Sequence, residues 1–309
     1  MRAFLPDFEA VSARTLVEAL TLLAQDRSAA QSVEATPSAV TPVNRRWQPL
    51  AGGTDLMVLF SAGKLPAGRY LDIWGIDELR GITVAPSHID LGALTTFTDV
   101  RQHALIAQEF PSLSQAAIES GAIAIQNRGT LGGNIANASP AADSPPALLT
   151  YDAELELVSL RGARWLPYAE FHTGYKQMQR AADELIARIR IPRCSPSERE
   201  RQLHYYRKVG TRRAQAISKV CMAASALRDG DRLARVRIGL GSVAPIPLRC
   251  RHTEAILESG ALTPSLVHEA QNILASEIAP IDDIRSTRDY RQHVAQGLLA
   301  DFVSRTLGL

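Results

Sequence analysis

The chain has 309 residues, 46% of them hydrophobic, which is enough for a large core divided into two or three domains. Its formal net charge of +2 gives no general attraction to nucleic acid or to membranes. No run approaches the roughly eighteen apolar residues of a membrane span, and Pro6 and Asp7 interrupt the N-terminus too early for a signal peptide, so we expect a soluble, cytoplasmic protein.

Helical and strand-like patterns alternate in the first half of the chain. Ser12 is a candidate N-cap for a helix in which Leu16, Leu20 and Leu23 share one face. Residues 29–46 are rich in Ser, Thr, Pro and Ala and predict an exposed loop. The other elements expected here are a helix over 56–60, a strand over 70–74, a hairpin of 81–85 with 88–93, and helices capped by Thr98 and Ser112.

The character of the sequence changes at about residue 180, where strand patterns become dominant. Before this point, Asp143 stands at an N-cap position ahead of Pro145 and Pro146. The mixture of strands and helices, without a repeating βαβ pattern, predicts an α+β fold. The expected elements are strands over 153–160, 185–191 and 203–209, a hairpin of 218–228 with 233–243, and three closing helices, one starting at Thr263-Pro264 and the last at Ser286.

Two glycine-rich segments about eighty residues apart carry the strongest functional signal. The first is Leu50-Ala51-Gly52-Gly53-Thr54-Asp55-Leu56, and the second runs from Asn127 to Ala136, with Asp143 shortly after it. A Gly-Gly pair lets the backbone adopt positive φ and approach a ligand, and converging backbone amides form an anion site. Together the two segments predict a dinucleotide held through its pyrophosphate from both sides. Neither segment has the P-loop or the G-x-G-x-x-G pattern, which argues against a P-loop ATPase and an ordinary Rossmann dehydrogenase.

Catalytic and metal-binding side chains show no recognisable pattern. Cys194, Cys221 and Cys250 contain no C-x-x-C pair, so we expect no iron–sulfur cluster in this chain. The seven histidines lack metal-ligand spacing, and there is no G-x-S-x-G. A bound redox cofactor would explain a protein whose own side chains do not indicate the chemistry.

A basic segment between Arg188 and Arg213 contains nine Lys and Arg residues, opposed only by Glu198 and Glu200. For most of them, exposure on a solvated face of the protein is the simplest interpretation. Nucleic-acid binding is a weaker interpretation, because Tyr205-Tyr206 is the only pair of aromatic residues among the basic ones. Recognition of an anion near a cofactor is the third interpretation, and it applies best to Lys208.

In these residues the chain resembles the FAD-binding medium subunit of the xanthine dehydrogenase and carbon monoxide dehydrogenase family of molybdenum hydroxylases. The motifs that carry the likeness are 51–56, 130–136 with Ser139-Pro140 and Asp143, and Tyr206-Arg207-Lys208 with Arg212-Arg213, in matching order and spacing. The resemblance implies a two-subdomain FAD-binding fold of the vanillyl-alcohol-oxidase type, followed by a C-terminal domain of antiparallel strands and helices. We expect these units at residues 1–60, 61–178 and 179–309.

The resemblance also implies roles for particular residues. Leu50 to Leu56 and Thr130 to Asn134 would wrap the pyrophosphate and ribose, and Ile135 and Ala136 would approach the isoalloxazine ring. The remaining implied contacts with FAD come from Gly121, Ala122, Asp143, Ile186 and Lys208, with Ile186 near the adenine and Lys208 beside the cofactor. The full implied set is Leu50, Ala51, Gly52, Gly53, Thr54, Asp55, Leu56, Gly121, Ala122, Thr130, Gly132, Gly133, Asn134, Ile135, Ala136, Asp143, Ile186 and Lys208.

The function implied by the family is electron transfer. A large molybdopterin subunit would hydroxylate the substrate, a small subunit with two [2Fe-2S] clusters would carry single electrons, and FAD on this chain would pass them to NAD, O2 or another acceptor. A self-sufficient flavin oxidase or reductase and an assembly subunit without FAD are the alternatives. Three features depart from the family pattern: Gln126, where Arg is common, Ala216-Ile217-Ser218 in place of Asp-Ile-Ala, and the long loop at 29–46.

Overall fold

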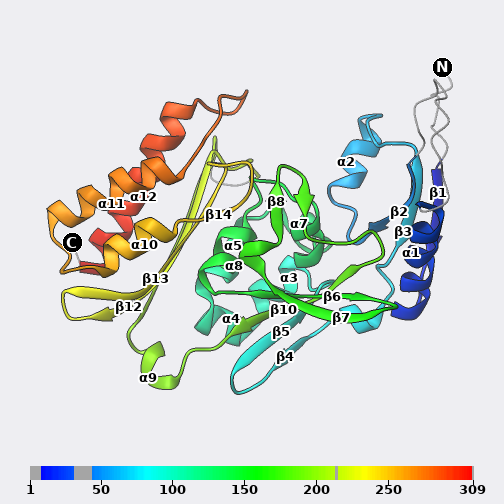
Figure 1. Cartoon of the computed structure of the whole chain (residues 1–309), viewed down its shortest axis with the longest axis horizontal. Helices are drawn as coiled ribbons and strands as arrows, with labels where there is room; N and C mark the ends of the chain where they lie inside the picture. Colours follow the sequence, from blue (N-terminus) through cyan, green and yellow to red (C-terminus); the bar gives the residue numbers. More distant parts are fainter. Residues whose placement is uncertain (1–7, 31–43, 213–214, 308–309) are drawn as a thin grey trace.

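The computed structural model describes residues 8–30, 44–212 and 215–307 (Figure 1). The N-terminal unit is a three-stranded parallel sheet in the order β1-β3-β2, joined by α1 and α2. Leu20 and Leu23 of α1 pack on Trp47 and Leu71 of the sheet, which explains the predicted apolar face of this helix. The elements are β1 (Phe8–Ser12), α1 (Leu16–Ala30), β2 (Asn44–Leu50), α2 (Leu56–Ser61) and β3 (Gly68–Asp72).

The middle unit is built on a five-stranded antiparallel sheet in the order β4-β5-β10-β6-β7. Short helices cover it and share one hydrophobic core with it. The strands are β4 (Ile82–Val84), β5 (His88–Gly92), β6 (Glu154–Ser159), β7 (Gly162–Pro167) and β10 (Leu185–Pro192), with a two-stranded ribbon of β8 (His172–Gly174) and β9 (Gln177–Met178). The helices are α3 (Phe97–Gln102), α4 (Ala104–Glu109), α5 (Pro111–Glu119), α6 (Ile123–Gln126), α7 (Leu131–Ala136) and α8 (Ser144–Thr150), with short 3-10 turns at Asp77–Leu79 and Tyr168–Glu170.

The C-terminal unit is an antiparallel sheet in the order β11-β12-β13-β14 with helices on both faces (Figure 1). Its own three closing helices cover one face, and α5 and α8 of the middle unit lie against the other. The contact is close: a Cβ on Gly239 of β13 would lie 2.4 Å from the carbonyl oxygen of Pro146 in α8. The elements are α9 (Pro196–Arg199), β11 (Gln202–Val209), β12 (Val220–Asp229), β13 (Arg232–Gly241), β14 (Leu248–Arg249), α10 (Arg251–Glu258), α11 (Pro264–Glu277) and α12 (Arg288–Leu307).

The first and middle sheets each extend one strand beyond the residues at which we expect the units to divide, and the division itself stays a prediction. β3 pairs with β1 and β2, so the first sheet continues past residue 60 to Asp72. β10 pairs with β5 and β6, so the middle sheet continues past residue 178 to Pro192. None of the helices in the described part of the chain is long and apolar enough to cross a membrane.

Several predicted helix starts are displaced by one to three residues. Ser12 ends β1, and Thr15 instead accepts the N–H of Glu18 at 3.2 Å. Thr96, not Thr98, caps α3 and forms a capping box with Asp99. Ser112 lies inside α5, which begins at Pro111, and Thr287 rather than Ser286 accepts a backbone N–H at the start of α12.

The prediction for Thr263 is confirmed, since its hydroxyl accepts the N–H of Leu266. Most of the loop expected at 29–46 lies outside the described residues.

Candidate functional site

The first glycine-rich segment is a half-buried turn between β2 and α2. Gly53 has a φ of +74°, in the left-handed region that L side chains rarely adopt. None of the backbone N–H groups of residues 51–55 donates a hydrogen bond to another described residue. Since partly buried backbone donors require partners, this run of adjacent N–H groups is available to solvent or to an anionic ligand.

The second segment is a short helix, α7, rather than a loop, and its first amides are already engaged. Thr130 is its N-cap, and Gly132 is fully buried against Ala93. The N–H groups of Leu131, Gly132, Gly133 and Asn134 donate to Thr95 O, Ala93 O, Thr130 Oγ1 and Thr130 O at 3.0, 2.9, 3.0 and 2.9 Å. The backbone expected to wrap a pyrophosphate from this side is therefore committed to the protein's own hydrogen bonds.

The two segments nevertheless meet in space. A Cβ added to Gly52 would lie only 1.7 Å from the carbonyl oxygen of Arg128, so only glycine fits between them. A Cβ on Gly133 would lie 3.8 Å from the Cβ of Ala51. The Arg128 guanidinium stacks on Trp74 with 3.7 Å between its central carbon and the ring centroid, next to this junction.

Asp143 connects the second segment to the C-terminal sheet. It occupies the N-cap position of α8, as predicted, but its side chain makes no capping hydrogen bond. Instead Lys208 Nζ donates to its Oδ2 at 2.7 Å, and Ser218 Oγ donates to its Oδ1 at 2.6 Å. Lys208 Nζ also donates to the carbonyl of Glu119, 3.0 Å away. The carboxylate is thus fixed by β11 and by the segment just before β12 instead of capping its own helix.

The electrostatics of this cluster are those of a buried ion pair. The side chains of Lys208 and Asp143 are only 8% and 14% exposed. Burial raises the pKa of Asp143, and the Lys208 ammonium opposes that change. Tyr206 donates its hydroxyl to the Asp143 carbonyl at 3.3 Å, and burial raises the pKa of Tyr206 well above its usual value. Ser144 Oγ donates to Asn134 Oδ1 at 2.6 Å, which orients the Asn134 side chain next to this cluster.

The predicted site residues fall into three groups by exposure. Ile135 and Ile186 belong to the core of the middle unit, so their side chains are enclosed by protein and only their backbone can face a ligand. The buried residues are Thr130, Gly132, Ile135 and Ile186, the exposed ones are Asp55 and Ala136, and the half-buried ones are Leu50, Ala51, Gly52, Gly53, Thr54, Leu56, Gly121, Ala122, Gly133, Asn134, Asp143 and Lys208.

Two contributors were not identified as site residues from the sequence. Ser218 is 1% exposed and binds Asp143, although the sequence marks it only as a departure from the family pattern. The Glu119 carbonyl holds Lys208 just ahead of Gly121, whose φ is +66°. Gln126, another of these departures, is buried and donates Nε2 to the Ile118 carbonyl at 2.8 Å. No sequence signal identifies the Glu119 carbonyl as a partner of Lys208. The position of Ser218 shortly after the Arg-rich motif could have indicated its contact with Asp143.

Comparison with protein families gives two matches that together span most of the chain. Residues 6–194 match the FAD binding domain in molybdopterin dehydrogenase. Residues 204–306 match the CO dehydrogenase flavoprotein C-terminal domain.

Individual relatives agree with these matches. The xanthine dehydrogenase FAD-binding subunit of Escherichia coli O157:H7 is 31% identical over 259 residues, covering 84% of this chain and 88% of that protein. The carbon monoxide dehydrogenase medium chain of Hydrogenophaga pseudoflava is 29% identical over 246 residues, covering 80% of this chain and 84% of that one. A solved structure of carbon monoxide dehydrogenase from the same organism superposes with a TM-score of 0.85 at 26% identity, covering 96% of each chain.

Proposed function

Since the chain belongs to the family of FAD-binding domains in molybdopterin dehydrogenases, we propose that it receives electrons from a [2Fe-2S] partner subunit and passes them to NAD or another acceptor. It is an FAD-binding medium subunit of the xanthine and carbon monoxide dehydrogenase type, and FAD is its cofactor. Bound FAD supplies the redox chemistry that links single-electron donors to a two-electron acceptor.

The proposal rests on the backbone N–H groups of residues 51–55, which donate to no other described residue. This turn includes Gly52, where no side chain fits. An anionic pyrophosphate fits such donors, because converging backbone amides favour negative charge. Gly52 keeps this turn in contact with the second segment at Arg128. The residues present therefore fit a dinucleotide, and we assign the first segment as its backbone anion site.

The second segment would contribute through side chains instead. The Oδ1 of Asn134 is held by Ser144, so the Nδ2 of the same side chain is oriented as a donor. Asp143 is held by Lys208 and Ser218 and cannot rotate without breaking both contacts. We propose that this cluster lies near the flavin and keeps its charged groups in fixed positions there. We also propose that Gly121 and Ala122 lie near the flavin, because Lys208 holds the carbonyl of Glu119 just ahead of them.

The proposed partners are a small subunit with [2Fe-2S] clusters and a large molybdopterin subunit. Relatives named as medium chains and FAD-binding subunits of dehydrogenases support a multi-subunit assembly of this kind. We also propose a cytoplasmic location: Cys194, Cys221 and Cys250 are all free thiols, as is usual in a reducing compartment.

The proposal is tested by purifying the chain alone and together with co-expressed partner subunits. The chain alone should contain stoichiometric FAD and no iron, and it should not oxidise substrate. Addition of the partners should bring molybdenum and iron into the complex and restore NAD reduction or transfer to another acceptor. Steady turnover of the isolated chain with a two-electron donor would favour a self-sufficient oxidase or reductase, and a colourless chain that does not take up FAD would contradict the proposal.

A further inference from the structure

A cavity of about 180 Å³ lies apart from the glycine-rich segments, between the middle unit and the C-terminal sheet. It is lined by Arg193, Arg199, Arg235 and Arg237, together with Glu109 and Asp152. Its lining includes Glu109 of α4 and Arg199 of α9, and Figure 1 shows these two helices in the lower part of the molecule, below α2 and α7. The cavity is therefore separate from the candidate flavin site.

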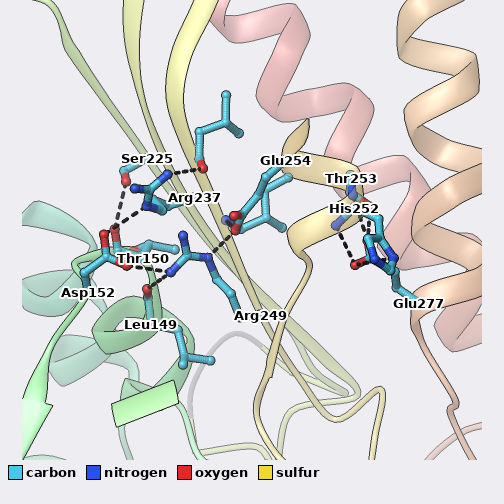
Figure 2. Close-up of polar contacts among 12 residues, drawn as sticks. Leu149, Thr150, Asp152, Ser225, Arg237, Arg249, His252, Thr253, Glu254 and Glu277 are labelled. Carbon is cyan, nitrogen blue, oxygen red and sulfur yellow. Dashed lines mark hydrogen bonds and ion pairs between the residues drawn. The ribbon is translucent and has the colours of Figure 1, made fainter. Parts of the chain in front are cut away.

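The lining has an excess of positive charge. Glu109 accepts hydrogen bonds from Arg193 at 2.6 and 2.8 Å and also contacts Arg199, and the Arg193 hydrogen bond lowers the pKa of this carboxyl. Asp152 accepts from Arg237 at 2.9 Å and from Arg249 at 2.7 Å (Figure 2).

Both carboxylates are ionised. Burial raises the pKa of Asp152, but the hydrogen bonds from Arg249 and Arg237 outweigh that effect and lower it. Burial raises the pKa of the Cys194 thiol, which also lines the cavity and stays uncharged. With their ion-pair partners included, five guanidinium groups thus face four carboxylates, Glu109, Asp152, Glu198 and Glu254, which leaves an excess of one positive charge.

The arginines retain hydrogen-bond donors that no other part of the described chain uses. Arg199 and Arg235 each employ only Nη1, toward Glu109 and Glu198. Arg237 employs Nε and Nη1 and leaves Nη2. Planar guanidinium groups with spare donors match the oxygens of phosphate in pairs.

The backbone at Arg235 is strained in a way that serves this lining. Its φ is +51°, in the left-handed region, although it lies within a β-strand. The pairing of β12 with β13 slips here, because Ser225 faces Arg237 and Leu227 faces Ala234, so β13 carries an extra residue. Such a bulge redirects a side chain, and strain of this kind persists where the surrounding structure or a ligand requires it.

We propose that this cavity binds a small dianion of the phosphate type, either inorganic phosphate or the phosphate group of a small metabolite. One phosphate group and its first waters fit the volume, and Arg199, Arg235 and Arg237 supply the donors. The site gives Arg199 of the basic segment a function distinct from that of Lys208, which donates to Asp143.

Isothermal titration with inorganic phosphate, and separately with glycerol 3-phosphate, tests the proposal on the FAD-loaded full chain, in which the pyrophosphate-binding turn is already filled. Sodium chloride of equal ionic strength is the reference titrant. We expect saturable phosphate binding that chloride does not reproduce. Arg235→Gln should weaken it about tenfold, which corresponds to about 1.4 kcal/mol.

Arg232→Gln is the matched control, because Arg232 lies on the same strand outside the cavity lining and should leave affinity unchanged. Arg199→Gln provides a second cavity variant should Arg235→Gln fail to fold. The tighter of the two ligands identifies the source of the phosphate. Absence of saturable binding by either ligand, or equal affinity in the Arg235 and Arg232 variants, would overturn this proposal. Either result leaves the proposed binding of FAD unaffected.

Discussion

The two glycine-rich segments look alike in sequence but are used differently by the fold. Residues 51–55 leave their backbone N–H groups without partners in the described chain. Residues 131–134 form the start of α7 and donate all of theirs to neighbouring protein oxygens. A Gly-Gly pair therefore does not by itself identify a ligand-binding backbone.

The difference depends on what each glycine touches. Gly52 is pressed against the carbonyl of Arg128 at the junction of the segments, whereas Gly132 is pressed against Ala93 inside the middle unit. In our proposal, the first segment offers backbone donors to FAD. The second packs in the protein core and would contribute side chains, through Asn134 and nearby Asp143.

The most damaging change is expected at the junction. In Gly52→Ala the new Cβ would lie 1.7 Å from Arg128 O, so the two segments must separate and FAD binding should be lost completely. Flavin absorbance of the purified variant measures this. Gly53→Ala is the control: its Cβ meets nothing closer than 3.5 Å, so it should retain FAD at a cost of about 1–2 kcal/mol for left-handed backbone. Equal flavin contents in the two variants would contradict the assignment.

The next largest effect is expected on Lys208→Met, which leaves the Asp143 carboxylate buried without its cation. Removing one partner of a buried ion pair costs about 3–5 kcal/mol in the free energy of unfolding. The double variant Lys208→Met/Asp143→Asn should recover part of this loss. A purely solvated lysine would show no change in either variant, and denaturant titration distinguishes the two outcomes.

The same variant predicts a pH dependence. Burial already raises the pKa of Asp143, and loss of Lys208 removes the opposing charge. A carboxyl whose pKa is higher in the folded state stabilises the fold below its unfolded pKa of about 4 and loses that contribution as the pH rises. The unfolding free energy of Lys208→Met relative to wild type should thus decline from acidic to neutral pH, and a constant difference would contradict the buried pair.

Gly132→Ala sharpens the contrast between the segments. The added Cβ would lie 2.6 Å from the Ala93 Cβ, and overpacking of this kind costs up to about 3 kcal/mol. The melting temperature of the FAD-free chain should fall, with any flavin loss following from instability. An unchanged melting temperature combined with lost FAD would mean that this glycine faces the ligand after all.

Ser218→Ala should have the smallest effect. It removes the 2.6 Å hydrogen bond to Asp143 Oδ1 and keeps Lys208, so we expect a loss of about 1.5 kcal/mol in unfolding free energy and a small shift in flavin potential. Ser218→Thr preserves the hydroxyl as a comparison. Identical potentials and stabilities in wild type and Ser218→Ala would show that Lys208 alone positions the carboxylate.

Local patterns predicted local structure well. The hairpin of β4 and β5, the hairpin of β12 and β13, and the start of α11 after Thr263 all follow from turn residues, alternation and capping chemistry. β1 was not predicted, because its pairing with β3 involves residues sixty positions away.

The motifs of the proposed site are visible in the sequence, but the hydrogen-bond partners of their residues are not. Whether the N–H of Gly132 is free depends on Ala93, and whether Asp143 caps α8 depends on Lys208 and Ser218. Spacing along the chain does not encode such partners. The cavity around Arg235 could not be predicted from the sequence for the same reason, since its lining comes from segments that meet only in the folded protein.

The most direct test of this account is a crystal structure of the FAD-loaded chain, in which the distances from the pyrophosphate oxygens to the backbone nitrogens of residues 51–55 are measured. We predict hydrogen bonds of about 2.9 Å to this turn and none to the N–H groups of residues 131–134. A pyrophosphate bound by the α7 amides, with residues 51–55 facing solvent, would contradict it.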